Sequence, residues 1–531
     1  MSELKQLEEM FRKGQISRRE FLVRASVLGL GAALSPAILT SPAQAETPKR
    51  GGRLRVGCTG GSTTNSLDPA TLNSTMPVFI NFQIRNCLVE IDYKGNAIPE
   101  LAESWEPSPD ATKWTFKLRR GVEFHNGKTL SAEDVIYSIN YHRGPESKSG
   151  AKSILSSIKE IKEDGKYTVV FFLQGGNADF PYIVSDYHLT IFPAGTKGAE
   201  FEKGVGTGGY ILQSYEPGVK ALTKRNPNYW KQGRAHFDEV ETISIADSSA
   251  RTNALKTGQI DVLDRCELRT VNLLKRSPGI KIVRVTSPLH YSIPTRTDVA
   301  PFNDNRVRLA LKLAVNREQM LKTILRGYGS LGNDHPIGPT YRFHATESEL
   351  PQRRYDPDKA KYLMKKAGQL DHTFELHAAD AAFAGAIDAA LLYKESAAKA
   401  GIKIKVVREP NDGYWSNVWM KKAWCMCYWA GRVTSDMMFS TAYWEKSNWN
   451  DTFWKNKRFN QLLVAARSEL DEKKRRAMYV EMQRIVRDEG GVVIPMFADV
   501  VEAATTRLKY RNLAGNLELD GQRMSERWWF E

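Results

Sequence analysis

Between residues 356 and 430 the sequence alternates between helix-like and strand-like segments, and this alternation constrains the fold more than any other feature. Asp356 and Pro357 have the residue types that cap and open a helix, and Gly368 has the type that ends one. In order, the segments are a helix over 356–368, a strand over 373–379, an alanine-rich helix ending at Gly401, a strand over 402–409, a helix over 414–424 and an apolar strand over 425–430. Strands joined through helices pair in parallel by right-handed crossovers, so the sequence predicts an α/β fold.

Elements outside this region are marked by capping residues and by alternation. Ser131, followed by Asp134 three residues later, predicts the start of a helix that runs through Asn140. Asp304 predicts the start of a second helix, over 305–327, with Gly327 at its end. Alternating apolar residues predict strands at 114–118 and 167–173. A strand over 51–58 leads into a long polar loop.

Arg432 stands directly after the apolar strand 425–430. In open parallel sheets ligands lie beyond the carboxyl ends of the strands, so this position predicts a ligand-facing charge. Seven of the twelve tryptophans lie nearby, between positions 415 and 454. Each of them alone is more typical of a core, but their concentration around a charged loop predicts a concave site with aromatic walls and a few polar groups.

The size and charge of the chain narrow the classes of protein to consider. A chain of 531 residues is too long for one compact core and predicts two or three domains. The net charge is +15, but the basic residues are scattered and the densest run, 473–476, lies in a helical stretch that also carries acids. This is the pattern of solvated helix faces, so we expect no nucleic-acid partner. Beyond the N-terminus, no apolar run is long enough for a membrane span.

The N-terminus has the pattern of an export signal. Arg18 and Arg19, followed by Phe21 and Leu22, precede a Gly/Ala-rich apolar stretch that ends in Ala43-Gln44-Ala45. The order of these residues resembles that of twin-arginine signals, which are read by a receptor and are not anchors. We therefore expect residues 1–45 to be a twin-arginine signal peptide and the mature protein to be periplasmic.

A search for catalytic and metal-binding motifs finds no convergent set. Gly204, Gly206 and Gly209 match the spacing of a dinucleotide-binding loop, but no apolar strand precedes them and the stretch 210–216 after them reads as a strand. Nucleophile elbows and zinc-protease motifs do not occur, and the nine histidines are dispersed. The five cysteines, at 58, 87, 266, 425 and 427, lie at no metal-ligand spacing and are interpreted as buried thiols. We expect no enzymatic activity, no metal site and no cofactor.

Several long motifs resemble one known family. The stretch 101–139 resembles the signature region of the family 5 extracellular solute-binding proteins, the dipeptide-, oligopeptide- and nickel-binding receptors of ABC importers. The stretches 206–230, 254–264 and 301–318 are similar to further motifs of that family, in the same order. The resemblance covers nearly all of the chain after residue 45.

This resemblance implies a two-lobed periplasmic binding protein of type II, cluster C-like, with an extra inserted subdomain. Lobe I would combine 46–90, 200–290 and 501–531, with 91–199 as the inserted subdomain, and lobe II would hold 291–500. A ligand would be enclosed as the lobes close about a hinge. The implied partners are a small-molecule or peptide ligand and the permease subunits of an ABC importer in the membrane, and the protein is expected to be a monomer.

The resemblance also implies the ligand-binding residues. Family members use the loop after the first strand, which contains Thr63 and Asn65 here, and the stretch that matches 411–436, which contains Trp415 and Trp429. In the peptide binders a Trp is followed shortly by an Asp that pairs with the α-amino group of the peptide. Here Arg432 stands at that position, and Asp436 comes four residues later. Arg432 either binds an anionic group of the ligand or is neutralised by Asp436 or another acid.

The class of ligand has alternatives at this stage. A cation in place of the Asp repels an ammonium group and attracts a carboxylate or a phosphate. This disfavours the usual contact with the amino terminus of a peptide and favours a ligand, a peptide or an opine-like compound, that presents a carboxylate here. A receptor for a metal chelate such as nickel is the alternative, because Arg and Trp can hold a chelate without protein ligands to the metal. A secreted enzyme on an α/β scaffold is the third hypothesis.

Overall fold

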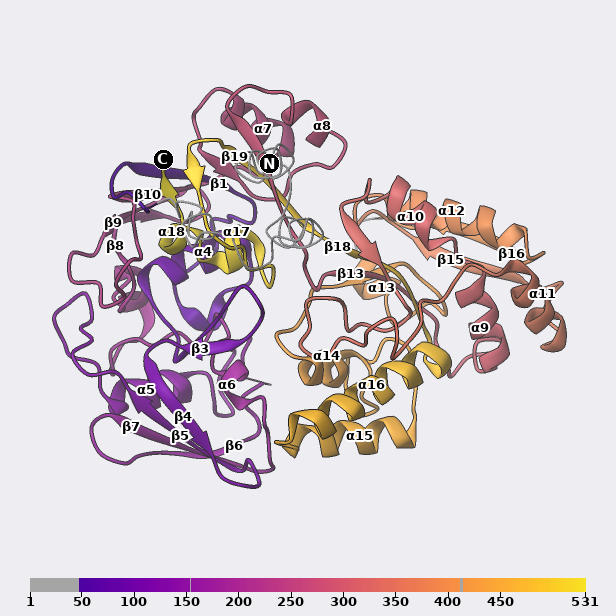
Figure 1. The fold of residues 1–531 in the computed structure, drawn as a ribbon, viewed down its shortest axis with the longest axis horizontal. Coiled ribbons are helices and arrows are strands. Elements are labelled where there is room, and N and C mark those ends of the chain that lie inside the picture. The colour runs from indigo at the N-terminus through magenta and orange to yellow at the C-terminus, as the bar shows by residue number, and fades with distance from the viewer. Residues whose placement is uncertain (1–46, 153, 411–413) are drawn as a thin grey trace, which may run out of the picture. The chain divides into compact units, whose positions relative to one another are not determined.

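A seven-stranded mixed sheet gathers strands from three distant parts of the chain. In the computed structural model, which describes residues 47–152, 154–410 and 414–531, β1 pairs in parallel with both β10 and β11, and the other pairs are antiparallel (Figure 1). The order is β12 (Ile280–Val285), β19 (Val500–Thr505), β11 (Val262–Leu263), β1 (Arg53–Cys58), β10 (Glu239–Ser244), β9 (Lys220–Arg225) and β8 (Tyr210–Glu216). The predicted strands at 51–58 and 210–216 are therefore confirmed.

Helices from both ends of the chain cover this sheet. The apolar helix α4 (Thr75–Ile84) is buried along its whole length and packs against β8 and β10. The C-terminal helices α17 (Glu518–Gln522) and α18 (Met524–Arg527) follow the short strand β20 (Leu508–Lys509) and precede β21 (Trp529–Phe530), with which β20 pairs. The short elements η1 (Pro69–Thr71), η2 (Gly198–Lys203), α7 (Ser248–Lys256) and α8 (Val271–Leu274) complete this part.

Residues 89–183 form a separate antiparallel sheet with its own apolar core. The sheet order is β4 (Ala102–Pro107), β5 (Lys113–Leu118), β7 (Thr168–Leu173) and β6 (Ile158–Glu163), and the pair β2 (Val89–Ile91) and β3 (Ala97–Pro99) lies before it in the chain. Helix α5 (Ala132–Tyr141) begins as predicted, because the Asp134 carboxylate accepts hydrogen bonds from the Ser131 N–H and hydroxyl, both at 3.0 Å. The one-turn helix α6 (Phe180–Ile183) follows β7.

A second large region is built on the antiparallel sheet β14 (Gly329–Leu331), β18 (Val492–Ala498), β13 (His290–Pro294) and β17 (Cys427–Trp429). The predicted strands 373–379 and 402–409 form the parallel pair β15 (Thr373–Ala378) and β16 (Lys403–Arg408), with α12 (Ala386–Ala398) between them. Helix α11 (Pro357–Lys366) is capped by Asp356 as predicted.

Two predictions in this region are wrong. The strand after β16 does not continue the parallel pairing: β17 pairs antiparallel with β13, and only an isolated bridge from His377 to Cys425 is parallel. The helix predicted over 414–424 forms one turn, α13 (Tyr414–Asn417), and the chain then bends at Met420, whose φ is 60°.

The helix predicted over 305–327 is two helices, α9 (Asn305–Leu313) and α10 (Arg317–Thr323). The break follows from Asn316, whose side chain accepts a hydrogen bond of 3.0 Å from the Gln319 N–H and so caps a new helix. The remaining helices of this region are α14 (Ser435–Ala442), α15 (Lys457–Ser468) and α16 (Glu472–Glu489).

The large sheets are joined by two segments, one between β12 and β13 and one between β18 and β19, and these segments are hydrogen-bonded to each other. The Ala498 N–H donates to the Leu289 carbonyl, and the Ser287 hydroxyl donates to the Ala498 carbonyl, both at 2.9 Å. Residues 50–531 form one compact unit, and the lobe boundaries given above stay a prediction. The predicted signal peptide, 1–45, lies outside the described residues. Among the helices that are described, none combines the length and the apolar character needed to cross a membrane.

Candidate functional site

Arg432 lies three residues after the edge strand β17, in a loop that other segments hold in place. Its backbone N–H donates to the Tyr341 hydroxyl at 3.0 Å, and one guanidinium N–H donates to the Ala430 carbonyl at 3.3 Å. The guanidinium carbon lies 6.0 Å from the centre of the Trp429 ring. No described carboxylate pairs with this half-buried guanidinium, so most of its five N–H donors remain available to a ligand.

The preceding glycine brings the loop against the connection between the two large sheets. A Cβ atom on Gly431 would overlap the ring of Pro288, so only glycine allows this close approach. Pro288 is two residues before His290, the first residue of β13. The position of Arg432 is therefore fixed relative to the strand connection.

Three aromatic groups lie close enough to Arg432 to respond to its charge. Burial lowers the pKa of His290 to about 4 and raises the pKa values of Tyr341 and Tyr187 to about 12, and the Arg432 charge acts on all three. None of these groups is an acid that is ionised at neutral pH. Among the residues that the structure describes, the surroundings of Arg432 thus supply hydrogen-bonding and aromatic groups and no ion-paired carboxylate.

Asp436 is committed to a different cation. It lies buried in the first turn of α14, and its carboxylate accepts from the Arg467 Nε–H at 3.2 Å. Burial raises the pKa of Asp436 to about 6, although Arg467 acts in the opposite direction. The hypothesis that Asp436 neutralises Arg432 is therefore wrong, because Asp436 pairs with Arg467.

A second buried ion pair lies beside Asp436. Arg475 and Asp179 are 2.8 Å apart and almost fully buried, and the Ala178 N–H donates to the Arg467 carbonyl at 2.7 Å. These contacts join the turn before α6 to α15 and α16. Asp436 therefore belongs to the packing of these elements, and in this structure its carboxylate is turned to Arg467.

Trp415 and Trp429 belong to a continuous group of aromatic rings. Trp415 packs edge-on against Trp419 and Tyr428, with ring centres 6.0 and 5.6 Å apart. Trp419 and Trp429 are 6.1 Å apart, and both contact Trp449, at 6.3 and 6.1 Å. Trp429 is itself buried, with 6% of its surface exposed, and Trp424 and Trp454 are buried core residues outside this group. The structure therefore brings together four of the seven clustered tryptophans.

A buried carboxylate fixes two of these rings. The indole N–H groups of Trp419 and Trp429 both donate to one oxygen of Asp451, at 3.1 and 3.2 Å. Asp451 has no described cation as a partner, and burial raises its pKa to about 6 even though both indoles favour the ionised form. Sequence reasoning missed Asp451. In the sequence, only its position two residues after Trp449 indicates that Asp451 lies near the clustered tryptophans.

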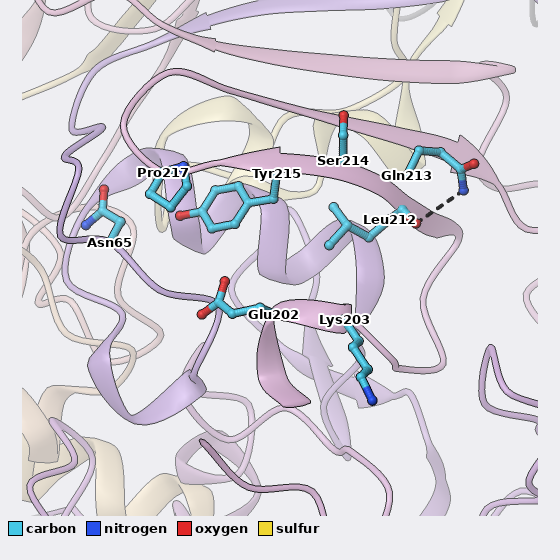
Figure 2. Close-up of a pocket in the computed structure, with 8 residues that line it drawn as sticks. All are labelled: Asn65, Glu202, Lys203, Leu212, Gln213, Ser214, Tyr215 and Pro217. Atoms are coloured by element: carbon cyan, nitrogen blue, oxygen red, sulfur yellow. Dashed lines mark hydrogen bonds between the residues drawn. The ribbon is translucent and has the colours of Figure 1, made fainter. Parts of the chain in front are cut away.

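Thr63 and Asn65 lie in the loop after β1. Thr63 is exposed, and its backbone lies against Gly218 in the turn between β8 and β9. Asn65 accepts a hydrogen bond of 2.6 Å from the Ser62 N–H and lines an open hollow of about 490 Å³ (Figure 2). Within the described residues, no hydrogen bond, ion pair or ring contact links Thr63 or Asn65 to Arg432.

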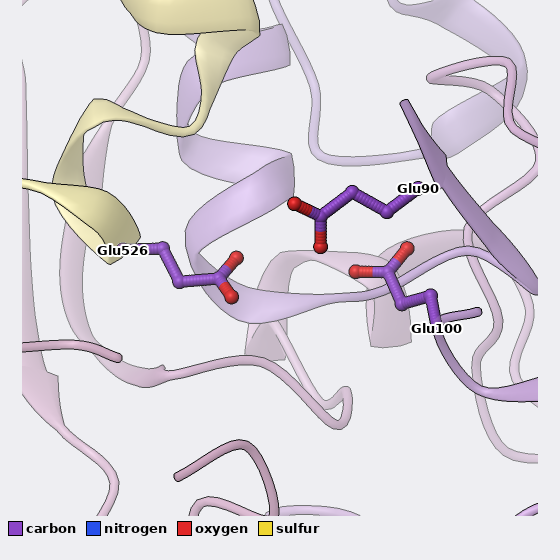
Figure 3. Close-up of side chains that lie close together, drawn as sticks. All are labelled: Glu90, Glu100 and Glu526. Atoms are coloured by element: carbon purple, nitrogen blue, oxygen red, sulfur yellow. The ribbon is translucent and has the colours of Figure 1, made fainter. Parts of the chain in front are cut away.

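One cluster of carboxylates has the spacing of metal ligands but already holds cations. Glu90, Glu100 and Glu526 are buried and face one another (Figure 3). The Lys231 ammonium lies 2.6, 2.7 and 3.0 Å from their oxygens, in the place a metal ion would take. Burial alone would raise the pKa of Glu90, but Lys231 and its neighbouring arginines hold it well below the usual value. The cluster is therefore an ion-pair network.

The chain matches a family model over residues 96–451, that of the bacterial extracellular solute-binding proteins, family 5. It is 26% identical over 535 residues to the dipeptide-binding protein of Escherichia coli, a match that covers 92% of this chain and 96% of that protein. It is 27% identical to heme-binding protein A of Haemophilus influenzae, where the match covers 62% of this chain and only 64% of the relative.

Among solved structures, the chain resembles a periplasmic binding protein associated with an ABC transporter of Helicobacter pylori, solved with the peptide STSA. The TM-score is 0.73 and the identity 25%, covering 91% of this chain and 99% of the other. This likeness confirms the predicted fold class, a two-lobed α/β periplasmic binding protein.

Proposed function

Because the chain belongs to the family 5 bacterial extracellular solute-binding proteins, the substrate receptors of ABC importers, we propose that it captures a small organic solute whose carboxylate is bound by Arg432. The solute is a peptide or another carboxylate-bearing compound. We propose further that the protein acts without catalysis, as a monomer, and delivers its ligand to a membrane permease.

The observation that carries this proposal is that no carboxylate in the described part of the chain pairs with the guanidinium of Arg432. Charges removed from water are normally paired, and every other charge of the 427–438 segment is paired: Asp436 bonds to Arg467. A carboxylate is the planar anion that a guanidinium binds with two parallel hydrogen bonds. Arg432 therefore favours a ligand with an anionic end over one that presents an ammonium group at this position.

The proposal also includes the remaining residues of the site and the route of export. Trp415 and Trp429 supply apolar contact beside Arg432, while Thr63 and Asn65 are proposed to reach the ligand from the loop after β1. Asp436 acts by holding the start of α14. We also propose that residues 1–45 direct the protein to the periplasm by the twin-arginine route and that the lobes have the boundaries given above.

Substitution of Arg432 tests the proposal. A thermal-shift panel of small carboxylates, each beside its amide, first selects a carboxylate that stabilises the protein, because a ligand of the folded state raises the melting temperature. We expect Arg432→Ala to weaken this carboxylate by about 1.5–3 kcal/mol, the range for hydrogen bonds to charged groups. Calorimetry measures the change, and Arg432→Lys should recover only part of it because an ammonium cannot bind a carboxylate as a fork.

Arg458→Ala is the matched control, since Arg458 is exposed and pairs with Glu481 on the surface. We expect it to bind like the wild type. If Arg432→Ala binds the carboxylate and its amide with the affinities of the wild type, the anion-binding role of Arg432 is wrong.

A further inference from the structure

We propose that the ligand also carries a flat, aromatic group, and that Trp415, Tyr428 and Trp449, the aromatic surface, bind it. This inference rests on the proposed function, because it assigns the other end of the solute whose carboxylate binds Arg432. It names a substrate class, aromatic carboxylates, that the anion site alone does not define.

The three residues of the aromatic surface are exposed, and two of them, Trp415 and Tyr428, pack directly on each other. Their exposed fractions are 40% for Trp415, 41% for Tyr428 and 50% for Trp449. Trp449 joins this pair through Trp419, whose ring contacts both Trp415 and Trp449. Contiguous exposed apolar surface of this kind typically marks a binding site.

The aromatic surface is continuous with the anion site. The Arg432 guanidinium is 6.0 Å from the Trp429 ring, and the Trp429 ring is 6.1 Å from that of Trp449. These two distances place the centre of the Trp449 ring within about 12 Å of the Arg432 guanidinium carbon, so a ligand bound to Arg432 can extend to the aromatic surface. This spacing fits a carboxylate separated from a ring by a short linker, about the length of a dipeptide.

The two rings behind the aromatic surface are held in place by hydrogen bonds. Asp451 accepts the N–H groups of Trp419 and Trp429, which form the layer behind the exposed rings. A carboxylate buried without a cation is costly, and here its hydrogen bonds fix the rotation of two indoles. Exposed rings that pack on such fixed rings lose less conformational entropy on binding than free side chains do, which strengthens a stacking contact.

Charge favours a neutral aromatic group over a cation on this surface. Among residues 414–451 the side chains of Lys421, Lys422, Arg432 and Lys446 are exposed or half-buried, against one exposed acid, Glu445. The other two acids of the stretch, Asp436 and Asp451, are buried. Aromatic faces attract cations as well as rings, but the surplus of positive charge repels a cationic ligand.

Three probes of equal backbone length test the inference. N-Benzoylglycylglycine carries a ring and a carboxylate, N-acetylglycylglycine carries only the carboxylate, and N-benzoylglycylglycinamide carries only the ring. We expect calorimetry to rank the benzoyl acid first, with Trp449→Leu and Trp415→Leu each weakening it about 3- to 10-fold, the range for aromatic pairs, and leaving the acetyl acid unchanged. Binding of the acetyl acid also shows that the variants are folded.

Tyr362→Leu is the matched control, because Tyr362 is exposed on α11 and belongs to no described ring pair. Equal affinity of the benzoyl and acetyl acids, or no effect of the two tryptophan substitutions, would overturn this inference and leave the anion site standing. Tighter binding of carnitine, a carboxylate with a trimethylammonium group, would assign the surface to a cation and also overturn it. Equal binding of the benzoyl acid and its amide would instead contradict the proposed function, and no binding of any probe at millimolar concentration would contradict both.

Discussion

At the scale of single residues, the position after β17 was predictable and its electrostatic partners were not. Apolar residues ending at Ala430 place Arg432 at a strand end, and the resemblance to family motifs marks the same position. Asp436 bonds to Arg467, and Asp451 bonds to two indoles. These contacts join residues that are 22 to 32 positions apart. Local sequence patterns carry no information about such pairs.

The raised pKa of Asp451 predicts a pH dependence of stability. Burial raises the pKa in the folded protein to about 6, above the ordinary value of 3.8, so between these values the folded state binds more protons than the unfolded state. This group therefore lowers the free energy of unfolding as the pH rises from about 4 to about 6. Asp451→Asn should remove this contribution.

Urea denaturation of the two proteins between pH 4.5 and 7.5 measures the effect. We expect Asp451→Asn to gain stability relative to the wild type as the pH rises, by on the order of 2 kcal/mol across this range. Asp371→Asn, at a fully exposed carboxylate, should show no such trend. A constant difference between Asp451→Asn and the wild type at all pH values would show that Asp451 titrates normally.

At the scale of helices and strands, capping residues were the most reliable guide. Ser131, Asp304 and Asp356 cap helices where the sequence predicts them. The errors have two causes. Asn316 caps a new helix inside an apolar pattern, and β17 pairs with β13, a strand more than 130 residues earlier, rather than with β16. Periodicity predicts the type of an element but not its partner.

The cap at Asp356 should contribute measurably to stability. Its carboxylate accepts a hydrogen bond of 2.9 Å from the Lys359 N–H at the start of α11. We expect Asp356→Ala to lower the free energy of unfolding by about 1 kcal/mol, measured as a lower urea midpoint. Asp358 lies two residues later in the first turn of α11 and makes no side-chain hydrogen bond among the described residues. Asp358→Ala should therefore remove only the interaction with the helix dipole, about 0.5 kcal/mol. Equal losses from the two substitutions would contradict the capping role.

At the scale of the whole molecule, only the family motifs predicted the architecture. The seven-stranded sheet places β19 between β12 and β11, with Thr505 opposite Ile280 and Ala504 opposite Val262. A strand from the C-terminal end thus completes a sheet that begins at residue 53. No periodicity predicts this insertion, because it depends on pairing between strands more than 200 residues apart.

The C-terminal segment is also bonded to the first hundred residues by a buried ion pair. Both guanidinium nitrogens of Arg523 bond to Glu100, at 2.6 and 2.8 Å, across a separation of 423 residues. We expect Arg523→Met to lower the free energy of unfolding by about 3–5 kcal/mol, because the buried carboxylate of Glu100 then loses the guanidinium charge that balances it. Arg265→Met, at an exposed pair with Glu518, should cost about 0–1 kcal/mol. Similar losses from both variants in urea denaturation would show that the buried network does not hold the C-terminal segment.

The central claim, that Arg432 binds the carboxylate of a small organic solute, is tested most directly by mass spectrometry of the ligand released when the purified protein is denatured. We expect the wild type and Arg458→Ala to release the same carboxylic acid, and Arg432→Ala to release at most a tenth as much, in line with the loss of a charge-assisted hydrogen bond. Release of a compound without an acidic group, or of a metal chelate, in equal amounts from all three proteins would contradict the claim.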